Sequence, residues 1–262
     1  MLHRNPMATL SPRSVFITGS SSGIGLELVR QLVNLSHRPQ HLLASCRDPS
    51  SDEARQLQDI AAAHPEVVVV KLDITSDQDI KEAVVTAEQV LGEEGLNLLI
   101  NNAAILSKVS GVRDVTRDDL VGHFDCNTAG PMMVSKSLLP LLLKAANKSL
   151  SHLSCNRAAI INVSSGLSSM SFCIKNMKHP WYSYICSKAA LTMATNIMGR
   201  ELCNDGILVA AVNPGHVKTN MGGSDAPICV EDCVSNLLRT FASFNERSVG
   251  LLHSNYGEVI PW

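Results

Sequence analysis

The sequence has few charged and few aromatic residues, and it has no long apolar run. Charged residues make up 18% of the 262 residues and aromatic residues 4%, whereas hydrophobic residues make up 45%, which is ordinary for a globular chain with a substantial core. No apolar run approaches the roughly 18 residues that a membrane-spanning helix needs. The formal net charge of −2 provides no basic field for nucleic acid or an anionic membrane. We therefore expect neither a membrane span nor a nucleic-acid partner.

Paired cysteines and metal-ligand spacings are also missing. The eight cysteines include no Cys-x-x-Cys pair and the nine histidines show no ligand spacing, so we expect no metal site, not even at Cys229 and Cys233, which are four residues apart. Residues 1–13 lack the apolar core of a secretory signal and are predicted to be a loose leader. In a chain of this length without such a signal, we expect reduced cysteines and a cytoplasmic protein.

What the sequence does contain is a regular alternation of apolar runs and segments with helical periodicity. The runs predicted as strands are 14–17, 41–46, 67–72, 96–100, 158–163, 206–212 and 250–253. Two long helices are expected over 118–146, with a bend at Gly130–Pro131, and over 181–203, whereas 167–180 is expected to be irregular. Strict alternation predicts an α/β fold: a single Rossmann-type domain over 14–262, with a doubly wound parallel sheet of about seven strands and helices on both faces.

A glycine-rich turn follows the first predicted strand. The stretch Thr18-Gly-Ser-Ser-Ser-Gly-Ile-Gly25 precedes a segment in which apolar residues recur at helical spacing. A strand, a glycine turn and a helix together bring backbone N–H groups and a helix N-terminus against a phosphate. Because three residues separate the first two glycines, the spacing departs from Gly-x-Gly-x-x-Gly, and an ordinary glycine–serine turn is the alternative. We expect dinucleotide binding.

The end of the second predicted strand bears on the choice of cofactor. This strand closes on Cys46 and is followed by Arg47 and Asp48. An acidic residue here binds the ribose 2′-hydroxyl of NAD, whereas a nearby arginine accepts the 2′-phosphate of NADP. Asp48 is one position late for the ribose contact, so Arg47 favours NADP(H). NAD(H) is the alternative cofactor, and a solvated loop charge is the alternative role of Arg47.

Tyr184 and Lys188 form a candidate acid–base pair. If residues 181–191 are helical, the two side chains lie one turn apart on the same face. A phenol has an ordinary pKa of about 10, and a cation beside it lowers that pKa toward the range of an effective proton donor. The spacing is common by chance, and an amphipathic helix with a packed tyrosine and a solvated lysine is the alternative.

Six motifs occur together in the order and spacing of one enzyme family. They are Thr18–Gly25, Asn-Asn-Ala-Ala at 101–104, Asn127, Asn-Val-Ser-Ser at 162–165, Tyr184-x-x-x-Lys188 and Pro-Gly-x-Val-x-Thr at 214–219. From Ser14 to its C-terminus the sequence resembles the short-chain dehydrogenases/reductases. Segments 44–49 and 214–223 and the final Pro-Trp resemble the branch that contains the sniffer carbonyl reductases and C-factor.

The resemblance implies a set of site residues. Ser165 and Tyr184 would act on a substrate carbonyl, Lys188 would bind the nicotinamide ribose and bias Tyr184 toward ionisation, and Asn127 would hold a water of a proton relay. The cofactor-binding residues that it implies are Gly19, Ser21, Ser22, Gly23, Ile24, Gly25, Arg47, Asp73, Ile74, Asn101, Ala103, Tyr184, Lys188, Pro214, Gly215, Val217 and Thr219.

Some positions depart from the family pattern or have a plainer explanation. Ala104 replaces a commoner glycine, and no basic residue stands at Ser22, so Arg47 would carry the phosphate preference largely alone. Ser165 could simply cap the segment that follows it, and Asn127 could be a buried helical amide bonded to backbone. Tyr182 is a rival phenol without a lysine four residues on.

The function implied is an NADPH-dependent carbonyl reductase that transfers a hydride to a small molecule, with Tyr184 as proton donor. If 167–180 lines the cleft, the substrate is an apolar or aromatic ketone, aldehyde or quinone. The alternatives are an NAD-dependent alcohol dehydrogenase of the same fold and a nucleotide-binding signalling or regulatory protein with little turnover. The family also implies a homodimer or homotetramer that pairs through the helices carrying Asn127 and Tyr184.

Overall fold

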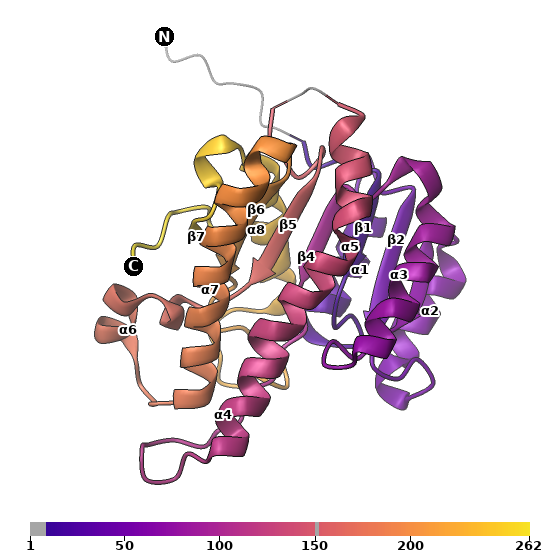
Figure 1. Cartoon of the computed structure of the whole chain (residues 1–262). Coiled ribbons are helices and arrows are strands. Elements are labelled where there is room, and N and C mark those ends of the chain that lie inside the picture. Colours follow the sequence, from indigo (N-terminus) through magenta and orange to yellow (C-terminus); the bar gives the residue numbers. More distant parts are fainter. Residues whose placement is uncertain (1–8, 150–151) are drawn as a thin grey trace.

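Seven parallel strands form one sheet in the computed structural model, which describes residues 9–149 and 152–262. The strands are β1 (Ser14–Ile17), β2 (His41–Cys46), β3 (Val67–Lys71), β4 (Leu98–Asn101), β5 (Ala159–Val163), β6 (Leu208–Asn213) and β7 (Leu252–Ser254). Their order across the sheet is β3-β2-β1-β4-β5-β6-β7 (Figure 1). The chain thus works outward from β1 in one direction and then, from β4, in the other. This arrangement confirms the predicted doubly wound, Rossmann-type fold.

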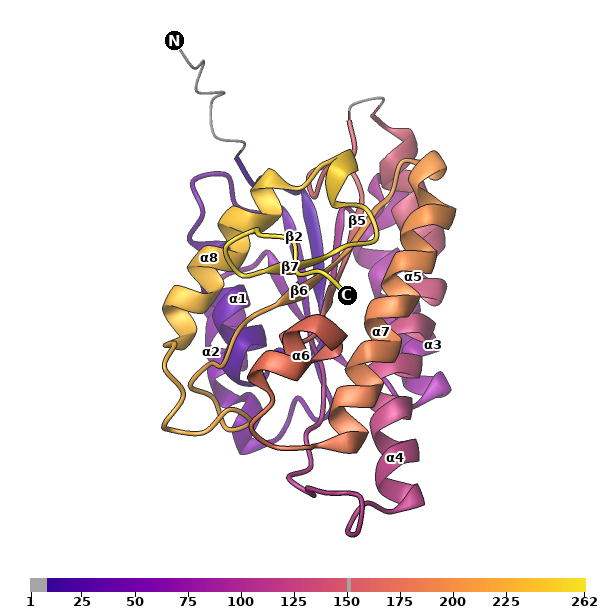
Figure 2. The ribbon, with the colours of Figure 1, turned by 90° about the vertical axis from the view of Figure 1, so that its left-hand side faces the viewer.

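Helices cover both faces of the sheet, so its strands are buried on both sides (Figures 1 and 2). In β1, Val15 and Ile17 pack into one hydrophobic core and Phe16 into the other, as the alternation of side chains along a strand requires. The first core lies under α1 (Gly23–Val33), α2 (Arg55–Ala63) and α8 (Val230–Ser243). The second core lies under α3 (Asp77–Leu91), α5 (Gly130–Asn147) and α7 (Tyr182–Leu202).

A wide turn interrupts the helix expected over 118–146. Helix α4 (Arg117–Phe124) leads into a π-helical turn at Asp125–Ala129, and α5 follows at once. Such turns carry an extra residue and often occur at functional sites. The distortion therefore precedes the bend expected at Gly130–Pro131, and it has Asn127 at its centre.

The stretch 167–180, expected to be irregular, contains a short helix. Helix α6 (Met170–Asn176) begins after Ser169, whose hydroxyl accepts a hydrogen bond of 3.1 Å from the backbone N–H of Phe172. A capping serine is a sequence signal for a helix start. On its own it does not predict the helix here, because the stretch shows no clear helical periodicity.

Residues 9–13 pack against the domain and are not part of a loose leader. Leu10 is buried in the first core, and the Asn156 side chain hydrogen-bonds the main chain of Thr9 and of Ser11. The rest of the predicted leader, residues 1–8, lies outside the described residues. Within the described ranges, no helix is both long enough and apolar enough to cross a membrane.

Candidate active site

The predicted site residues gather at the carboxyl ends of β1, β4, β5 and β6. β1 and β4 are neighbours at the point where the strand order reverses, and ligands of open α/β sheets bind at such a switch point. The motifs follow these strands, lie at the start of α7 or, for Asn127, lie in the turn between α4 and α5, toward the lower edge of the sheet in Figure 1. The fold thus brings together motifs that are far apart in the sequence.

The glycine turn is packed so closely that side chains do not fit. Gly19 and Gly23 have φ angles of 70° and 54°, which favour glycine. A Cβ on Gly19 would lie 2.9 Å from the Cα of Ala103, and a Cβ on Gly25 would overlap the carbonyl oxygen of Gly19. At these glycines the turn therefore presents main chain to whatever binds there.

Two residues outside the predicted set of site residues hold this turn in place. Asn102 Nδ2 donates hydrogen bonds of 3.0 Å to the carbonyl oxygens of Thr18 and Gly19. Thr18 Oγ1 accepts hydrogen bonds of 3.0 Å from the backbone N–H groups of Asn102 and Ala103. These bonds join the ends of β1 and β4, and they place Ala103 beside Gly19 at the cleft.

Asn101, predicted to line the cofactor cleft, points its side chain elsewhere. Asn101 Nδ2 donates to Asn162 Oδ1 at 2.8 Å and to Ser135 Oγ at 2.9 Å, and the side chain is buried. Successive side chains of a strand point to opposite faces, so Asn102, not Asn101, faces the glycine turn. The expected contact of Asn101 with the cofactor does not involve this side chain, and it stays a prediction.

The start of α1 fits a phosphate group. Ser22 is the N-cap residue, yet its side chain makes no capping hydrogen bond, so no side chain occupies the first N–H groups of the helix. Ser21 precedes this position, and Ile24 and Gly25 form the first turn. A helix N-terminus next to closely packed glycines binds phosphate oxygens through its N–H groups. The residues present thus fit the pyrophosphate of a dinucleotide.

The segment 214–219 approaches the glycine turn from β6. A Cβ on Gly23 would lie 3.2 Å from the Thr219 methyl group. Pro214 accepts a hydrogen bond of 3.3 Å from a buried thiol of α8, Val217 is buried in the first core, and Gly215 has a φ of 84°. The core therefore fixes this segment close to the turn, as its predicted cofactor contact requires.

At the end of β2, Asp48 is hydrogen-bonded within its own turn, whereas Arg47 is exposed. Asp48 Oδ1 accepts hydrogen bonds from the hydroxyl and the backbone N–H of Ser50, at 2.6 and 2.8 Å, and these bonds lower the pKa of the carboxyl. Arg47 is exposed. The carboxylate is therefore held by its own turn, and the guanidinium is the better placed of the two to meet a ligand.

Asp73 and Ile74 follow β3, as predicted for the adenine end of the site. Asp73 Oδ1 accepts hydrogen bonds of 2.9 and 2.7 Å from the N–H and the hydroxyl of Thr75. Ile74 is buried, and a Cβ on Gly130 would lie 2.9 Å from its carbonyl oxygen. Glycine at position 130 thus lets the start of α5 approach the end of β3.

Ser165 caps the segment that follows it, as its plainer explanation expects, and its catalytic role stays a prediction. Its Oγ accepts a hydrogen bond of 3.2 Å from the backbone N–H of Leu167, which caps the short turn at 166–168. The same side chain lies close enough to the Tyr184 phenol to favour a lower pKa for that group.

Buried hydroxyl groups join this turn to α7. Thr192 Oγ1 lies 2.7 Å from Ser164 Oγ and 2.9 Å from Ser168 Oγ. Ser168 Oγ donates a hydrogen bond of 2.6 Å to the carbonyl oxygen of Ser165. This network fixes the turn of Ser165 against the helix that carries Tyr184. Single serines and threonines give no sequence signal for it.

Tyr184 and Lys188 share one face of α7, as predicted, but burial dominates their titration. Lys188 Nζ lies 6.0 Å from the centre of the Tyr184 ring and donates a hydrogen bond of 2.7 Å to the carbonyl oxygen of Val163. Burial raises the pKa of Tyr184 to about 12 and lowers the pKa of Lys188 to about 8. In the protein alone desolvation dominates the pKa of Tyr184, and the bias of Tyr184 toward ionisation by Lys188 stays a prediction.

Asn127 is fully buried in the π-helical turn. Its Oδ1 accepts a hydrogen bond of 2.9 Å from the N–H of Ile105, and its Nδ2 donates bonds of 3.0 Å to the carbonyl oxygen of Ile105 and to Ser187 Oγ. This is the alternative expected of it, a buried amide bonded to backbone. Its role in holding a relay water stays a prediction.

Two segments meet beside the predicted site, 102–116 after β4 and 164–181 after β5. Gly111 N–H donates a hydrogen bond of 3.2 Å to the carbonyl oxygen of Pro180. The rings of His179 and Trp181 stack with their centres 5.2 Å apart. Together the two segments flank the Ser165–Tyr184 pair.

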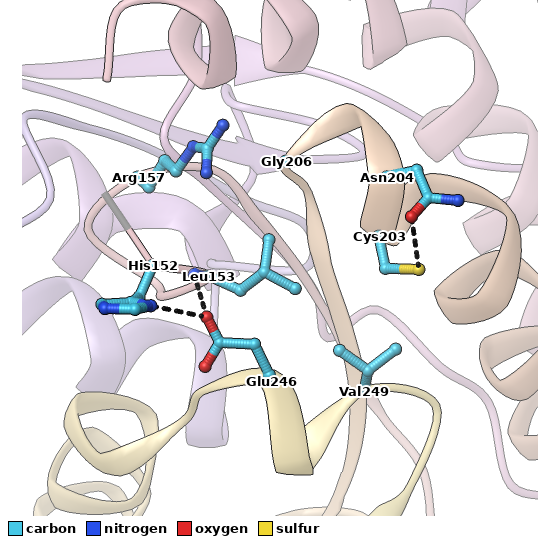
Figure 3. A pocket seen from close by; sticks show the side chains of 8 residues that line it. All are labelled: His152, Leu153, Arg157, Cys203, Asn204, Gly206, Glu246 and Val249. Atoms are coloured by element: carbon cyan, nitrogen blue, oxygen red, sulfur yellow. Dashed lines mark hydrogen bonds and ion pairs between the residues drawn. The ribbon is translucent and has the colours of Figure 1, made fainter. Parts of the chain in front are cut away.

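A separate pocket lies at the opposite edge of the sheet. Its cavity of about 470 Å³ is lined by His152, Leu153, Arg157, Cys203, Asn204, Gly206, Glu246 and Val249 (Figure 3). These residues lie near the amino ends of β5 and β6, and none of them belongs to the predicted site. The predicted chemistry therefore belongs to the cleft at the carboxyl ends.

Comparisons with known proteins agree with this geometry. The family model described as short chain dehydrogenase matches residues 13–227. The structure of an NADPH-bound carbonyl reductase from chicken fatty liver is 38% identical, with a TM-score of 0.94 over 98% of this chain and 96% of that chain. The carbonyl reductase Sniffer of D. melanogaster is 35% identical, with a TM-score of 0.91 over 96% and 100% of the two chains. The C-signal of Myxococcus xanthus is 30% identical over 167 residues, which cover 64% of this chain and 93% of that protein.

Proposed function

The chain belongs to the short chain dehydrogenase family, and from this premise we propose that it is an NADPH-dependent carbonyl reductase. The observation that carries the proposal is the arrangement at α7: the buried amine of Lys188 lies 6.0 Å from the centre of the Tyr184 ring, and Ser165 is close enough to the phenol to influence its pKa. The likeness to two carbonyl reductases, one of them bound to NADPH, supports this choice over other activities of the fold.

The chain's own residues would divide the work of reduction. NADPH supplies the hydride when it is bound. Tyr184 donates a proton to the carbonyl oxygen as negative charge develops there, and Ser165 donates a hydrogen bond to the same oxygen. Lys188, which now donates to Val163, would also hold the ribose hydroxyls, and Asn127 fixes the main chain of Ile105 beside the cleft.

The remaining predicted residues would hold the cofactor. The turn from Gly19 to Gly25 would take the pyrophosphate, Arg47 the 2′-phosphate, and Asp73 with Ile74 the adenine. Ala103 and the segment 214–219 would flank the nicotinamide. Support comes from the closely packed glycines and the uncapped start of α1, which fit a dinucleotide phosphate.

The proposed substrate is a small apolar or aromatic ketone, aldehyde or quinone. Apolar side chains of the two segments beside the cleft, among them Ile105, Phe172 and Trp181, support this class. We place the reaction in the cytoplasm, and the free thiols of all eight cysteines support this choice.

The test follows NADPH oxidation with a panel of quinones, aldehydes and ketones, in parallel with NADH. Tyr184→Phe is the inactive variant and Tyr182→Phe its matched control. Turnover that prefers NADPH, vanishes in Tyr184→Phe and persists in Tyr182→Phe supports the proposal. A preference for NADH with alcohols would favour the dehydrogenase alternative. Tight binding of NADPH without any turnover would favour a regulatory protein.

We also propose that two copies of the chain pair through α4 and α7. These helices pack against each other on one side of the molecule (Figure 2). Large apolar side chains remain exposed on this layer, including Phe124 on α4, Met132 on α5 and Ile197 on α7. Exposed apolar side chains gathered on one layer are typical of a contact surface.

A further inference from the structure

The net charge of −2 conceals an uneven distribution of charge. The segments 102–116 and 164–181, beside the predicted site, contain Lys108, Arg113, Lys175 and Lys178 and only one acidic residue, Asp114. The whole chain has 22 basic and 24 acidic residues, so the remainder carries an excess of acidic residues. The two segments are therefore basic in their own composition, which the whole-chain charge does not reveal.

These four basic side chains are exposed and unpaired. Among the described residues, no ion pair involves any of them. At the opposite edge of the sheet, by contrast, Lys144 and Lys148 pair with Glu93 and Glu94 at 3.1 and 2.7 Å. Positive charge on these two segments is thus available to an external anion.

Large apolar side chains stand exposed among these charges. Met170 and Ile174 are four residues apart on α6, so they share one face of the helix, and they are 71% and 84% exposed. Val112, next to Arg113 on the other segment, is 71% exposed. We call Lys108, Val112, Arg113, Ile174, Lys175 and Lys178 the rim face. In Figure 2 the viewer looks onto the side of the molecule where α6 and the loop before α4 lie.

Helix α6 is held in this orientation from its other side. A Cβ on Gly166 would lie 2.9 Å from the Phe172 ring, so this ring packs against the turn after Ser165. The hydroxyls of Ser169 and Ser171 both donate to the carbonyl oxygen of Pro261, the latter at 2.9 Å. Because these contacts fix the inner side of the helix, Ile174 does not turn into the cleft and its exposure needs another explanation.

We propose that the rim face binds the surface of an anionic membrane, with the cleft entrance against the lipid headgroups. Basic residues beside exposed apolar residues are typical of segments that lie in the membrane interface. Lysine is depleted at the centre of protein–protein interfaces, so a lysine-rich face with scattered apolar residues fits lipid better than a protein partner. Each basic residue near an anionic surface strengthens binding by about fivefold.

This binding does not depend on the proposed function, but it gives that function a consequence. Apolar carbonyl compounds partition into bilayers, and an enzyme whose cleft opens onto the headgroups would meet them there. The mode of attachment is interfacial and reversible, and it differs from a membrane span.

The experiment measures binding of the full chain to vesicles by co-sedimentation. Vesicles of phosphatidylcholine alone are compared with vesicles that contain about 30% phosphatidylserine, at about 0.05 and 0.5 M salt. The variants are Lys175→Glu/Lys178→Glu and Ile174→Asp. Their matched controls, at exposed residues of α3 and α5, are Lys81→Glu/Lys136→Glu and Val85→Asp. Circular dichroism checks that each variant is folded.

We expect binding that requires phosphatidylserine, weakens at high salt, and falls at least about tenfold in both rim-face variants but not in their controls. Absence of phosphatidylserine-dependent binding would overturn the proposal. So would equal losses in the rim-face variants and the controls, because binding would then follow total charge or general hydrophobicity. A change of oligomeric state in the rim-face variants, without vesicle binding by the parent protein, would assign the face to contact between copies instead.

Discussion

Lys188 Nζ lies 6.0 Å from the centre of the Tyr184 ring, and both groups are withdrawn from water strongly enough to change their titration. The pKa of Tyr184 is raised to about 12, so the phenol keeps its proton through the neutral and mildly alkaline range. The pKa of Lys188 is lowered to about 8. Lysine, rather than tyrosine, is therefore the group of this pair that changes charge nearest to neutral pH.

The first prediction concerns the pH dependence of carbonyl reduction. As the pH rises through about 8, Lys188 loses its charge. The neutral amine no longer attracts the negative charge that develops on the carbonyl oxygen of the substrate. We expect kcat/KM for a neutral carbonyl substrate to fall over this range. Arginine stays protonated in proteins, so Lys188→Arg should show lower activity but no fall near pH 8. The same alkaline fall in both proteins would show that another group titrates.

The second prediction concerns stability. Lowering the pKa of Lys188 from 10.5 to about 8 corresponds to a cost of about 3 kcal/mol for burying the charged amine. The full cost applies below pH 8, where the native and the unfolded states are both protonated. It declines as the pH rises from 8 to 10.5, because the native state releases its proton first.

Lys188→Met should therefore raise the free energy of unfolding at pH 7, by up to about 3 kcal/mol, while it abolishes reduction. Its advantage should shrink toward pH 10. Urea unfolding at several pH values measures both effects, and Lys136→Met, at an exposed position of α5, is the control. A variant that is less stable than the parent at pH 7 would contradict this expectation.

The third prediction concerns the choice of cofactor. Arg47 is exposed after β2, whereas the carboxylate of Asp48 is bound to Ser50. If Arg47 binds the 2′-phosphate, Arg47→Ala loses a charge-assisted hydrogen bond of about 1.5–3 kcal/mol. KM for NADPH should then rise about 10- to 100-fold, with little change for NADH. Arg55→Ala, at an exposed position of α2, is the matched control. An unchanged NADPH preference in Arg47→Ala would show that Arg47 is only a solvated loop charge.

Patterns of residue type predicted the fold, and the features that the sequence missed lie where tertiary packing decides. Apolar runs are buried strands because helices cover both faces, and Tyr184 and Lys188 share a face because α7 is regular there. The sequence could not show that Asn102 rather than Asn101 faces the glycine turn, since that depends on the register of β4. It could not show the sign of the Tyr184 pKa shift either, because desolvation comes from residues that are distant in the chain.

The fourth prediction concerns assembly. Phe124 and Ile197 are 53% and 56% exposed on the layer of α4 and α7. If two copies pair there, Phe124→Glu/Ile197→Glu places charges in an apolar contact, and the protein should sediment as a monomer. Val85→Glu, at a similarly exposed apolar position of α3, is the control, because α3 is not one of the two helices proposed to pair. A parent protein that is already monomeric at micromolar concentration would rule out pairing through this layer.

The fifth prediction compares a glycine in the closely packed turn, Gly25, with a glycine on the surface of a helix, Gly122. A Cβ on Gly25 would overlap the carbonyl oxygen of Gly19, which is backbone and has no rotamer to move into. Gly25→Ala should therefore destabilise the fold by roughly 1–3 kcal/mol and weaken NADPH binding, because the turn must open at the point where phosphate is expected. In α4, a Cβ on Gly122 would meet no atom within 4 Å. Gly122→Ala should raise stability by about 0.5–1 kcal/mol and leave NADPH binding unchanged.

Thermal unfolding and a fluorescence titration with NADPH measure both effects of each substitution. The decisive comparison is between the two readouts in Gly25→Ala. Loss of stability with intact NADPH affinity would mean that the close packing serves the joint between β1 and β4 and that phosphate binds elsewhere. Loss of affinity beyond what the unfolded fraction explains would place the phosphate at this turn, since only a ligand against the main chain of Gly19 and Gly25 senses the added methyl group.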